Sequence, residues 1–282
     1  MEPTPLSGLP FELALRAQVR FVSVGFLRRR AFREELALLD RFLAHLGISD
    51  PAAIESARRQ RCLATWIRGA RADYAKLSLA RQSAWLPLAS DLEATLRGGA
   101  LLVATHFGGG LLTPLALAQL GVPMLAIVST PARPARFPRL VEIVDISRES
   151  TLRAVARAHA TLRRGGVVFL AGDRASGSRD GDIDVNVLGR TRRISRGFAE
   201  LSLAASVPPT PVFSRVDQAG NIFTWALPAL VGSGETHKAR VASLAQSYAR
   251  RVSEVFARYP GNVAPPSIRS FFESPPYPPE AV

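Results

Sequence analysis

The sequence predicts an α/β fold: a single domain with a mixed, mostly parallel sheet flanked by helices, preceded by a helical amino-terminal section. Short apolar runs of strand length alternate with longer helical patterns through the middle of the chain. Strand pairs separated by turn residues follow later, and no internal repeat or long linker divides the 282 residues. The expected organisation is a helical section over residues 1–88, packed on an α/β core over residues 89–282.

The amino-terminal section is predicted to be helical and basic. Residues 11–46 mix apolar side chains with arginines, as in one or two amphipathic helices that pack on a core. The same pattern is typical of a helix that lies on an anionic membrane surface. Asp50 followed by Pro51 is a helix-start signal, because it places an N-cap before a proline at the first helical position. The further helices expected in this section are residues 52–81 and 88–97.

Four short apolar runs are predicted to be the buried strands of the core, because each has strand length and is bounded by turn residues. They are residues 100–104, 124–128, 141–146 and 167–171. Helical patterns separate them. One has Pro114 in its first turn and Gly121 as its carboxyl-terminal cap, and another runs from Thr151 to Arg164 with Ser150 as its N-cap.

The last third of the chain is predicted to contain two strand pairs and two helices. The strand pairs are residues 185–188 with 190–194, and residues 210–216 with 222–227. The helices are residues 196–206 and 238–259, and the proline-rich tail from Pro260 is expected to be irregular.

A histidine stands at the most informative point of this pattern. His106 follows the strand at residues 100–104, and Gly108, Gly109 and Gly110 lead from it into the next helix. In open α/β sheets, ligands bind at the carboxyl ends of the strands. We expect the glycines to let a substrate approach the backbone, and the helix start to offer N–H donors to an anion or an oxyanion.

A second polar group follows a strand in the same way. Asp173 and Arg174 come directly after the apolar run at residues 167–171 and the glycine that ends it. Because parallel strands present their carboxyl ends at one edge of a sheet, we expect His106 and Asp173 to share a site.

Composition narrows the class of protein. Apolar residues make up 47% of the chain and the formal charge is +13, which favours an anionic partner: a membrane surface, a phosphate-bearing ligand or an acidic carrier protein. A general arginine bias would also explain the charge. Neither zinc-finger spacing nor a basic stripe rich in aromatic residues occurs, so nucleic acid is not expected.

Other classes are also disfavoured. Cys62 is the single cysteine, so neither a disulfide framework nor a cysteine metal site is expected, and no cofactor is predicted. We find no signal peptide and no uncharged run long enough to span a membrane, so the expected location is cytoplasmic, either free or peripheral on the inner membrane. The nucleophile elbow G-x-S-x-G is absent, which argues against a serine hydrolase, and the P-loop and dinucleotide motifs are absent too.

Several segments of the core resemble one family. They are A-T-H-F-G-G after the first strand, G-G-V-V-F-L-A-G-D-R, V-L-G-R-T-R-R-I-S-R-G-F-A-E-L-S-L-A-A-S, and P-P-T-P-V-F-S. Over residues 90–215 the chain resembles the lysophospholipid acyltransferase superfamily, most closely its bacterial lipid A lauroyl/myristoyl acyltransferase branch. The resemblance implies a glycerolipid acyltransferase-like fold. His106 matches the family's histidine, Asp173 its later aspartate, and Gly189 and Gly197 its glycine segment.

The sequence departs from the family at one important position. The family reads H-F-G-N-W-E, with an acid five positions after the histidine, and Leu111 stands there in this chain. In the family that acid orients the histidine and stabilises its charged form, and leucine can do neither. Asp173 is the expected replacement, with Glu142 and Asp145 as weaker candidates.

The resemblance implies transfer of an acyl group from an acyl-carrier-protein or CoA thioester to a hydroxyl or amine acceptor, with His106 as general base. Two alternatives stay open: a pseudoenzyme that binds acyl groups, and a thioesterase or cyclase reaction on the same scaffold. The residues expected to bind substrate are Thr105, Phe107, Gly108, Gly109, Gly110, Arg133, Arg136, Arg174, Gly189, Arg190 and Gly197. For the anionic part of the donor, we expect contacts from Arg133, Arg136, Arg174, Arg190, Arg192 and Arg193.

Overall fold

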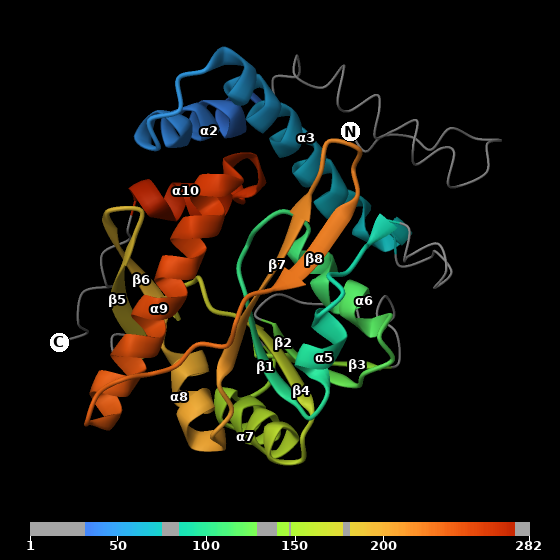
Figure 1. Ribbon diagram of the computed structural model, residues 1–282, viewed down its shortest axis with the longest axis vertical. Helices are drawn as coiled ribbons and strands as arrows, with labels where there is room; N and C mark the ends of the chain where they lie inside the picture. The colour runs from blue at the N-terminus through green and yellow to red at the C-terminus, as the bar shows by residue number, and fades with distance from the viewer. Residues whose placement is uncertain (1–31, 75–84, 129–139, 147, 177–180, 274–282) are drawn as a thin grey trace.

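A computed structural model describes residues 32–74, 85–128, 140–146, 148–176 and 181–273. The first part of the helix predicted over residues 11–46, and Arg133 and Arg136, lie outside the described residues. Within them the chain is an α/β fold with a mixed, mostly parallel sheet flanked by helices (Figure 1), which confirms the predicted fold class.

The sheet has six strands in the order β3-β2-β4-β1-β7-β8. All neighbouring strands are parallel except β7 and β8, which form an antiparallel hairpin. The strands are β1 Ala100–Ala104, β2 Met124–Val128, β3 Val141–Asp145, β4 Val167–Ala171, β7 Pro209–Val216 and β8 Ile222–Ala226. The bounds of β1, β2 and β4 agree with the sequence prediction because each is a continuous apolar run, as expected of a strand buried on both faces.

Helices cover both faces of the sheet, and alternate residues of β1 show why. Leu101 and Val103 belong to the cluster that includes helices α7 Thr151–Arg163, α8 Gly197–Ala205 and α9 His237–Arg258. Ala100, Leu102 and Ala104 belong to the cluster that includes α5 Leu92–Leu96 and α6 Thr113–Ala118. Because successive side chains of a strand point to opposite faces, β1 anchors both helical layers.

A separate hairpin lies beside α9 (Figure 1). It consists of β5 Asp182–Val187 and β6 Arg190–Ser195, joined by a turn in which Leu188 and Gly189 have φ of 52° and 80°. Two positive φ values suit the turn type that matches the twist of a two-residue hairpin. The hairpin packs against α9 through buried apolar side chains that include Val185 and Val187.

The first helices of the described chain pack on its last elements. Helices α2 Arg33–His45 and α3 Pro51–Tyr74 lie above α10 Pro265–Phe272 in Figure 1. Helix α2 contacts α10, and α3 contacts the 3-10 turn η5 Pro260–Asn262. Asp50 caps α3 as predicted, since its carboxylate accepts a hydrogen bond of 2.9 Å from the Ala53 backbone N–H. None of the described helices is both long and apolar enough to cross a bilayer.

Three local predictions need correction, one in full and two in part. The tail after Pro260 was expected to be irregular, but it forms η5 and α10, and the latter begins with Pro265 at its first position. Ser150 occupies the N-cap position of α7 as predicted, but its side chain makes no capping hydrogen bond. Helix α6 has Pro114 in its first turn as predicted, but it ends at Ala118 with Gln119 as its cap, before the predicted cap at Gly121.

Candidate active site

The topology and register of the sheet bring His106 and Asp173 together. Strands β1 and β4 are parallel neighbours, and Ala104 pairs with Ala171 at their carboxyl ends. His106 and Asp173 each lie two residues beyond that pair. The chain leaves β1 toward β2 on one side and leaves β4 toward β7 on the other, so the pair stands where the strand order reverses, which is the usual ligand position in such sheets.

The two side chains are in direct contact. The Nδ1 atom of His106 lies 2.8 Å from Oδ1 of Asp173, and the His106 backbone N–H donates to Oδ2 at 3.0 Å. An ionised carboxylate accepts only, so Nδ1 carries the ring proton and Nε2 is the basic nitrogen of the neutral ring. Nε2 has no hydrogen-bond partner in the described part of the chain, and the His106 side chain is 25% exposed. The predicted proximity of His106 and Asp173 is therefore confirmed.

Asp173 remains ionised although it is buried. Burial by itself would raise its pKa, but the charge and the two hydrogen bonds of His106 outweigh burial, and the charge of Arg192 adds to their effect. The pKa of Asp173 consequently lies below its ordinary value of 3.8. A charged carboxylate on Nδ1 fixes the ring orientation and stabilises an imidazolium once Nε2 takes a proton.

Helix α10 closes the far side of the dyad. The Ser267 hydroxyl lies 3.3 Å from Oδ2 of Asp173 and 3.4 Å from the carbonyl oxygen of His106. The Ser270 hydroxyl donates to the Ser267 carbonyl at 3.2 Å and accepts from the buried guanidinium of Arg192. Arg192 is thus linked to Asp173 through two serines of one helix.

Tyr248 of α9 supports the same edge of the sheet from the other direction. Its hydroxyl donates to the Ala104 carbonyl at 2.7 Å, at the end of β1. Burial raises its pKa well above the ordinary value of 10.0, and the negative charge of Asp173 acts in the same direction. Tyr248 therefore stays protonated and fixes the strand end from which His106 projects.

The N–H groups of the glycine turn are not free, although the sequence predicted that they would be. We expected free N–H groups there, yet Gly108 donates to the Asn262 carbonyl at 2.6 Å and Gly109 to the Ser214 carbonyl at 2.8 Å. Gly110 donates to the Phe107 carbonyl at 2.8 Å. These donors are satisfied within the protein, so in this conformation they form no anion or oxyanion cradle.

The glycines are needed for close packing of the chain on itself. A Cβ atom at Gly108 would lie 2.2 Å from the Ser214 carbonyl oxygen, and one at Gly109 would lie 2.5 Å from an Ile222 methyl group. One at Gly110 would lie 2.9 Å from the Thr105 carbonyl oxygen. We expected these glycines to let a substrate approach the backbone. Instead, the turn packs against strands β7 and β8.

The residues on either side of His106 point into the protein. Thr105 is 4% exposed, and its hydroxyl has no hydrogen-bond partner in the described part of the chain. Phe107 is 2% exposed, with its ring stacked on Phe256 at 6.0 Å and its edge on Phe213. Both were predicted to bind substrate, but their side chains belong to the packed interior.

The predicted binding residues beyond the dyad are spread over several places. Arg174 is exposed directly after Asp173. Gly189 lies in the turn of the β5–β6 hairpin, where the Leu188 carbonyl accepts a hydrogen bond from His45 of α2. The guanidinium of Arg190 lies 5.1 Å from the centre of the Phe272 ring. Gly197 begins α8. The structure shows no contact of Gly189, Arg190 or Gly197 with His106.

Three further predicted residues are corrected or explained. Arg192 was predicted as part of an anion-binding surface, but it is only 5% exposed and belongs to the interior beside Asp173. Arg193 is partly buried and lies 3.4 Å from Asp184. Glu142, a weaker candidate for the acid, pairs instead with Arg157 on α7.

The remaining candidates for the acid do not replace Asp173. Asp145 lies 3.9 Å from Arg148 at the end of β3, which is separated from β1 by β2 and β4. Leu111 is placed in the 3-10 turn η3 Gly110–Leu112, and its side chain lies outside the described part. No cluster of three or more histidine, cysteine or acidic side chains that would hold a metal ion occurs among the described residues.

Some residues of the site were missed at the sequence level. Tyr248 lies on the buried face of α9, whose apolar positions recur with helical periodicity, so a search of that face could have found it. Ser267 and Ser270 carry no such signal, although Pro265 at a first helical position indicates the helix that bears them.

A cavity lies at the opposite edge of the sheet, lined by Gly99 and Ala100 at the start of β1 and by Pro208 and Thr210 near the start of β7. It is therefore separate from His106, which follows the other end of β1.

No protein-family model matches the sequence, and no curated protein matches it significantly. The assignment of a function therefore depends on the geometry of the site and on the sequence motifs.

Proposed function

We propose that this protein is an acyltransferase in which His106 acts as general base. It would transfer an acyl group from an acyl-carrier-protein or CoA thioester to a hydroxyl or amine acceptor. The observation that carries the proposal is the contact of 2.8 Å between His106 Nδ1 and Asp173, which leaves Nε2 basic and without a partner in the described residues. The histidine thus has an acid partner although Leu111 stands at the position of the family's acid.

The reaction follows from this arrangement. Nε2 of His106 takes the proton of the acceptor hydroxyl or amine as that atom attacks the thioester carbonyl carbon. The tetrahedral intermediate then collapses, the carbon–sulfur bond breaks, and the imidazolium returns its proton to the departing thiolate. The products are the acylated acceptor and the free thiol. Asp173 stabilises the imidazolium in between, because the carboxylate is ionised and in contact with Nδ1.

One observation favours the alternative of an acyl-binding module without turnover. The N–H groups of Gly108, Gly109 and Gly110 are all used within the protein. Acyl transfer needs donors for the developing oxyanion, and losing one such donor typically costs about 10²–10³-fold in rate. Under the acyltransferase proposal, the oxyanion receives hydrogen bonds in one of two ways. Either the glycine N–H groups become free when substrate binds, or residues other than these three glycines supply the donors.

The proposed partner is an acyl carrier protein or acyl-CoA, approached through exposed positive charge. Arg174 follows Asp173 directly and is exposed, and the chain has a net charge of +13. A peripheral contact with an anionic membrane belongs to the same proposal, because exposed arginines attract any anionic surface.

The test is thioester turnover by the protein and its His106→Ala variant. Acyl-CoA or an acyl-carrier thioester is supplied with candidate hydroxyl and amine acceptors, and mass spectrometry identifies the products. We expect acyl transfer by the parent, and a loss of about 10²–10⁴-fold on removal of the base. His237→Ala, at an exposed histidine that pairs with Glu200, serves as the matched control and keeps the parent rate.

The products separate the alternatives. A free fatty acid as the main product would indicate a thioesterase, and binding without any turnover by the parent would indicate the acyl-binding module. Undiminished turnover in His106→Ala would remove the general-base assignment.

A further inference from the structure

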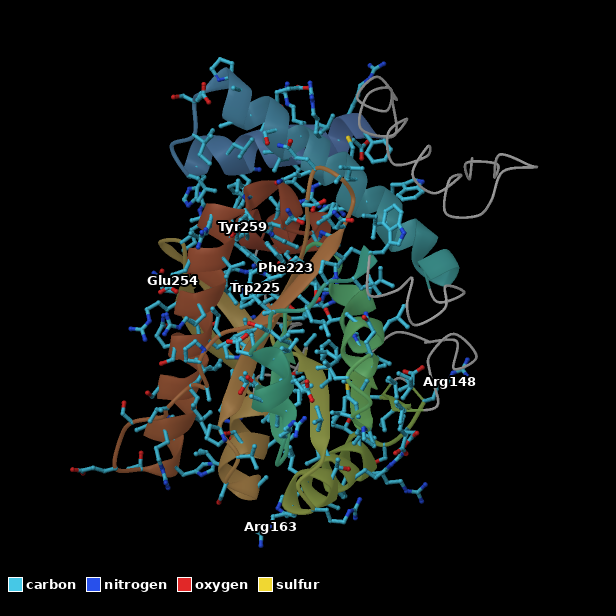
Figure 2. All side chains as sticks on the ribbon, turned by 45° about the vertical axis from the view of Figure 1, so that its right-hand side comes forward. Arg148, Arg163, Phe223, Trp225, Glu254 and Tyr259 are labelled. Carbon is cyan, nitrogen blue, oxygen red and sulfur yellow. The ribbon has the colours of Figure 1, made fainter. Side chains whose placement is uncertain are left out.

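A patch of aromatic and arginine side chains lies between the β7–β8 hairpin and the end of α9. Phe223 and Trp225 of β8 and Tyr259 after α9 are all partly exposed, and Figure 2 shows the three labelled close together. The ring of Trp225 stacks on Phe223 at 6.0 Å and meets the Tyr259 ring at 6.0 Å. We call these three residues, together with Arg215 and Arg258, the aromatic–arginine patch.

Two guanidinium groups flank the tyrosine of this patch. Arg215 lies 5.1 Å from the centre of the Tyr259 ring and 5.6 Å from that of Phe223, its cross-strand neighbour. Arg258 lies 5.4 Å from the same Tyr259 ring. These distances are typical of cation–π contacts, which orient a guanidinium but do not neutralise its charge.

Neither arginine has a carboxylate partner in the described part of the chain. The Nε atom of Arg215 is buried without a hydrogen-bond acceptor. Glu254 pairs with Arg251 at 3.0 Å, and Figure 2 shows it at the outer side of α9, apart from the three labelled rings. Asp217 accepts hydrogen bonds from the turn that joins β7 to β8.

The patch adjoins the turn that bears His106. The ring of Phe107 lies 6.4 Å from that of Trp225 and 6.5 Å from that of Tyr259. A Cβ atom at Gly108 would lie 3.0 Å from the Cα atom of Arg215. A ligand on the patch would therefore be next to the backbone of the candidate active site.

We propose that the aromatic–arginine patch binds an anionic amphiphile. The anionic group lies between Arg215 and Arg258, and the apolar group covers the exposed parts of Phe223 and Trp225. The charge is complementary, because guanidinium forks bind phosphate and carboxylate with paired hydrogen bonds. Removing the exposed aromatic surfaces from water adds a favourable contribution that an inorganic anion lacks. The proposal concerns binding and holds whether or not His106 is catalytic.

The protein carries an internal reporter for this site. Of its three tryptophans, Trp66 and Trp85 are 7% and 4% exposed, whereas Trp225 is partly exposed within the patch. We expect dodecyl phosphate, added below the concentration at which it forms micelles, to give a saturable blue shift of the fluorescence. Trp225→Phe should abolish the shift while calorimetry still detects binding.

Charge variants test the role of the arginines. Arg215→Gln and Arg258→Gln should each weaken dodecyl phosphate binding about tenfold or more, as expected for the loss of a hydrogen bond to a charged group. Arg163→Gln is the matched control: it removes an exposed arginine from α7 and should leave the affinity unchanged. Equal weakening by all three would show that net charge alone attracts the ligand, and unchanged affinity in the two patch variants would overturn the proposal. If the Arg215→Gln variant does not fold, the Arg258→Gln variant tests the proposal alone, because Arg258 is exposed.

Further ligands identify the chemistry. Dodecanoate compared with dodecyl phosphate distinguishes a carboxylate head from a phosphate head, and binding of either supports the proposal. Inorganic phosphate or dodecyl maltoside binding as tightly as dodecyl phosphate would contradict it, because each lacks one of the two required features. His106→Ala should bind dodecyl phosphate like the parent, so a failure of the acyltransferase proposal is distinguishable from a failure of this one.

Discussion

At the scale of single residues, the acid that orients the histidine comes from a neighbouring strand. His106 follows β1 and Asp173 follows β4, and their contact depends on the pairing of Ala104 with Ala171. An acid five positions after the histidine would reach it through a local turn. An acid on the neighbouring strand instead requires the register of the sheet, so the geometry of the dyad is as rigid as the strand pairing.

Restoring an acid at position 111 should help only when Asp173 is absent. Asp173 already occupies Nδ1 of His106, so Leu111→Glu alone should not raise the rate of acyl transfer. Asp173→Asn should lower it by about 10²–10⁴-fold, because the amide no longer stabilises the imidazolium. Part of that loss should be recovered in the double variant. The rates come from the thioester assay, and a rise in Leu111→Glu alone would contradict the assignment of Asp173.

The low pKa of Asp173 also predicts how its contribution to stability varies with pH. A group whose pKa is lower in the folded than in the unfolded state stabilises the fold above its unfolded pKa, and Asp173 is such a group. The contribution is complete above the ordinary value of 3.8 and is lost as the pH falls through the lower folded value.

Urea unfolding of the parent and of Asp173→Asn between pH 3 and pH 7, about the range over which an aspartate titrates, measures this contribution. The free-energy difference between the two proteins should be constant at neutral pH and shrink at the acid end. A difference that grows as the pH falls would contradict the sign of the shift.

At the scale of elements, the glycine turn is where the chain that follows β1 packs closely against the β7–β8 hairpin. Gly108 has φ of 46°, and its missing side chain leaves room for the Ser214 carbonyl. Gly189 also has a positive φ, of 80°, but nothing lies within 4 Å of its Cβ position. Gly189 therefore requires only a positive φ, whereas Gly108 requires both a positive φ and the absence of a side chain.

Alanine substitution at these two positions should have unequal effects. Gly189→Ala adds only backbone strain, which costs about 1–2 kcal/mol for a residue other than glycine in the left-handed region. Gly108→Ala adds the same strain and forces the Ser214 carbonyl aside, so its loss of unfolding free energy should be larger by about 1–3 kcal/mol. Denaturant unfolding measures both, and equal losses would show that the turn has room to relax.

At the scale of the whole molecule, the two ends of the described chain are packed together. A Cβ atom at Gly261 of η5 would lie 2.5 Å from the carbonyl oxygen of Ala57 in α3, and the Phe271 ring of α10 meets Phe42 of α2 at 5.5 Å. Helix α10 in turn carries Ser267, which contacts Asp173. The dyad is therefore supported by a helix that the amino-terminal section holds in place.

This arrangement predicts one cooperative unfolding transition. Trp66 is buried in α3 and reports on the amino-terminal helices, while far-ultraviolet circular dichroism reports on all helices and strands. In a background that carries both Trp85→Phe and Trp225→Phe, Trp66 is the single tryptophan, and thermal transitions by fluorescence and by circular dichroism should coincide, as in a two-state protein. Gly261→Ala should lower both midpoints together, whereas an earlier fluorescence transition would mean that α3 melts independently of the core.

The sequence by itself determined the strands and the position of the dyad residues. The continuous apolar runs of β1, β2 and β4 mark strands buried on both faces, and a parallel sheet places the residues after such strands at one edge. His106 and Asp173 could therefore be assigned to one site, because local patterning and a general rule of topology were sufficient. The same reasoning identified the cap at Asp50, which depends on neighbours in the chain.

Only the tertiary structure decided what surrounds that dyad. Ser267 contacts Asp173 across 94 positions of the sequence. Asn262 and Ser214, whose carbonyls accept from the N–H groups of Gly108 and Gly109, lie even farther along the chain from the glycine turn. Arg192, one of many arginines in the sequence, is buried because β6 turns it toward Asp173 and Ser270. Hydrogen bonding and burial of this kind depend on which distant segments pack together, and hydrophobic periodicity carries no information about such pairings.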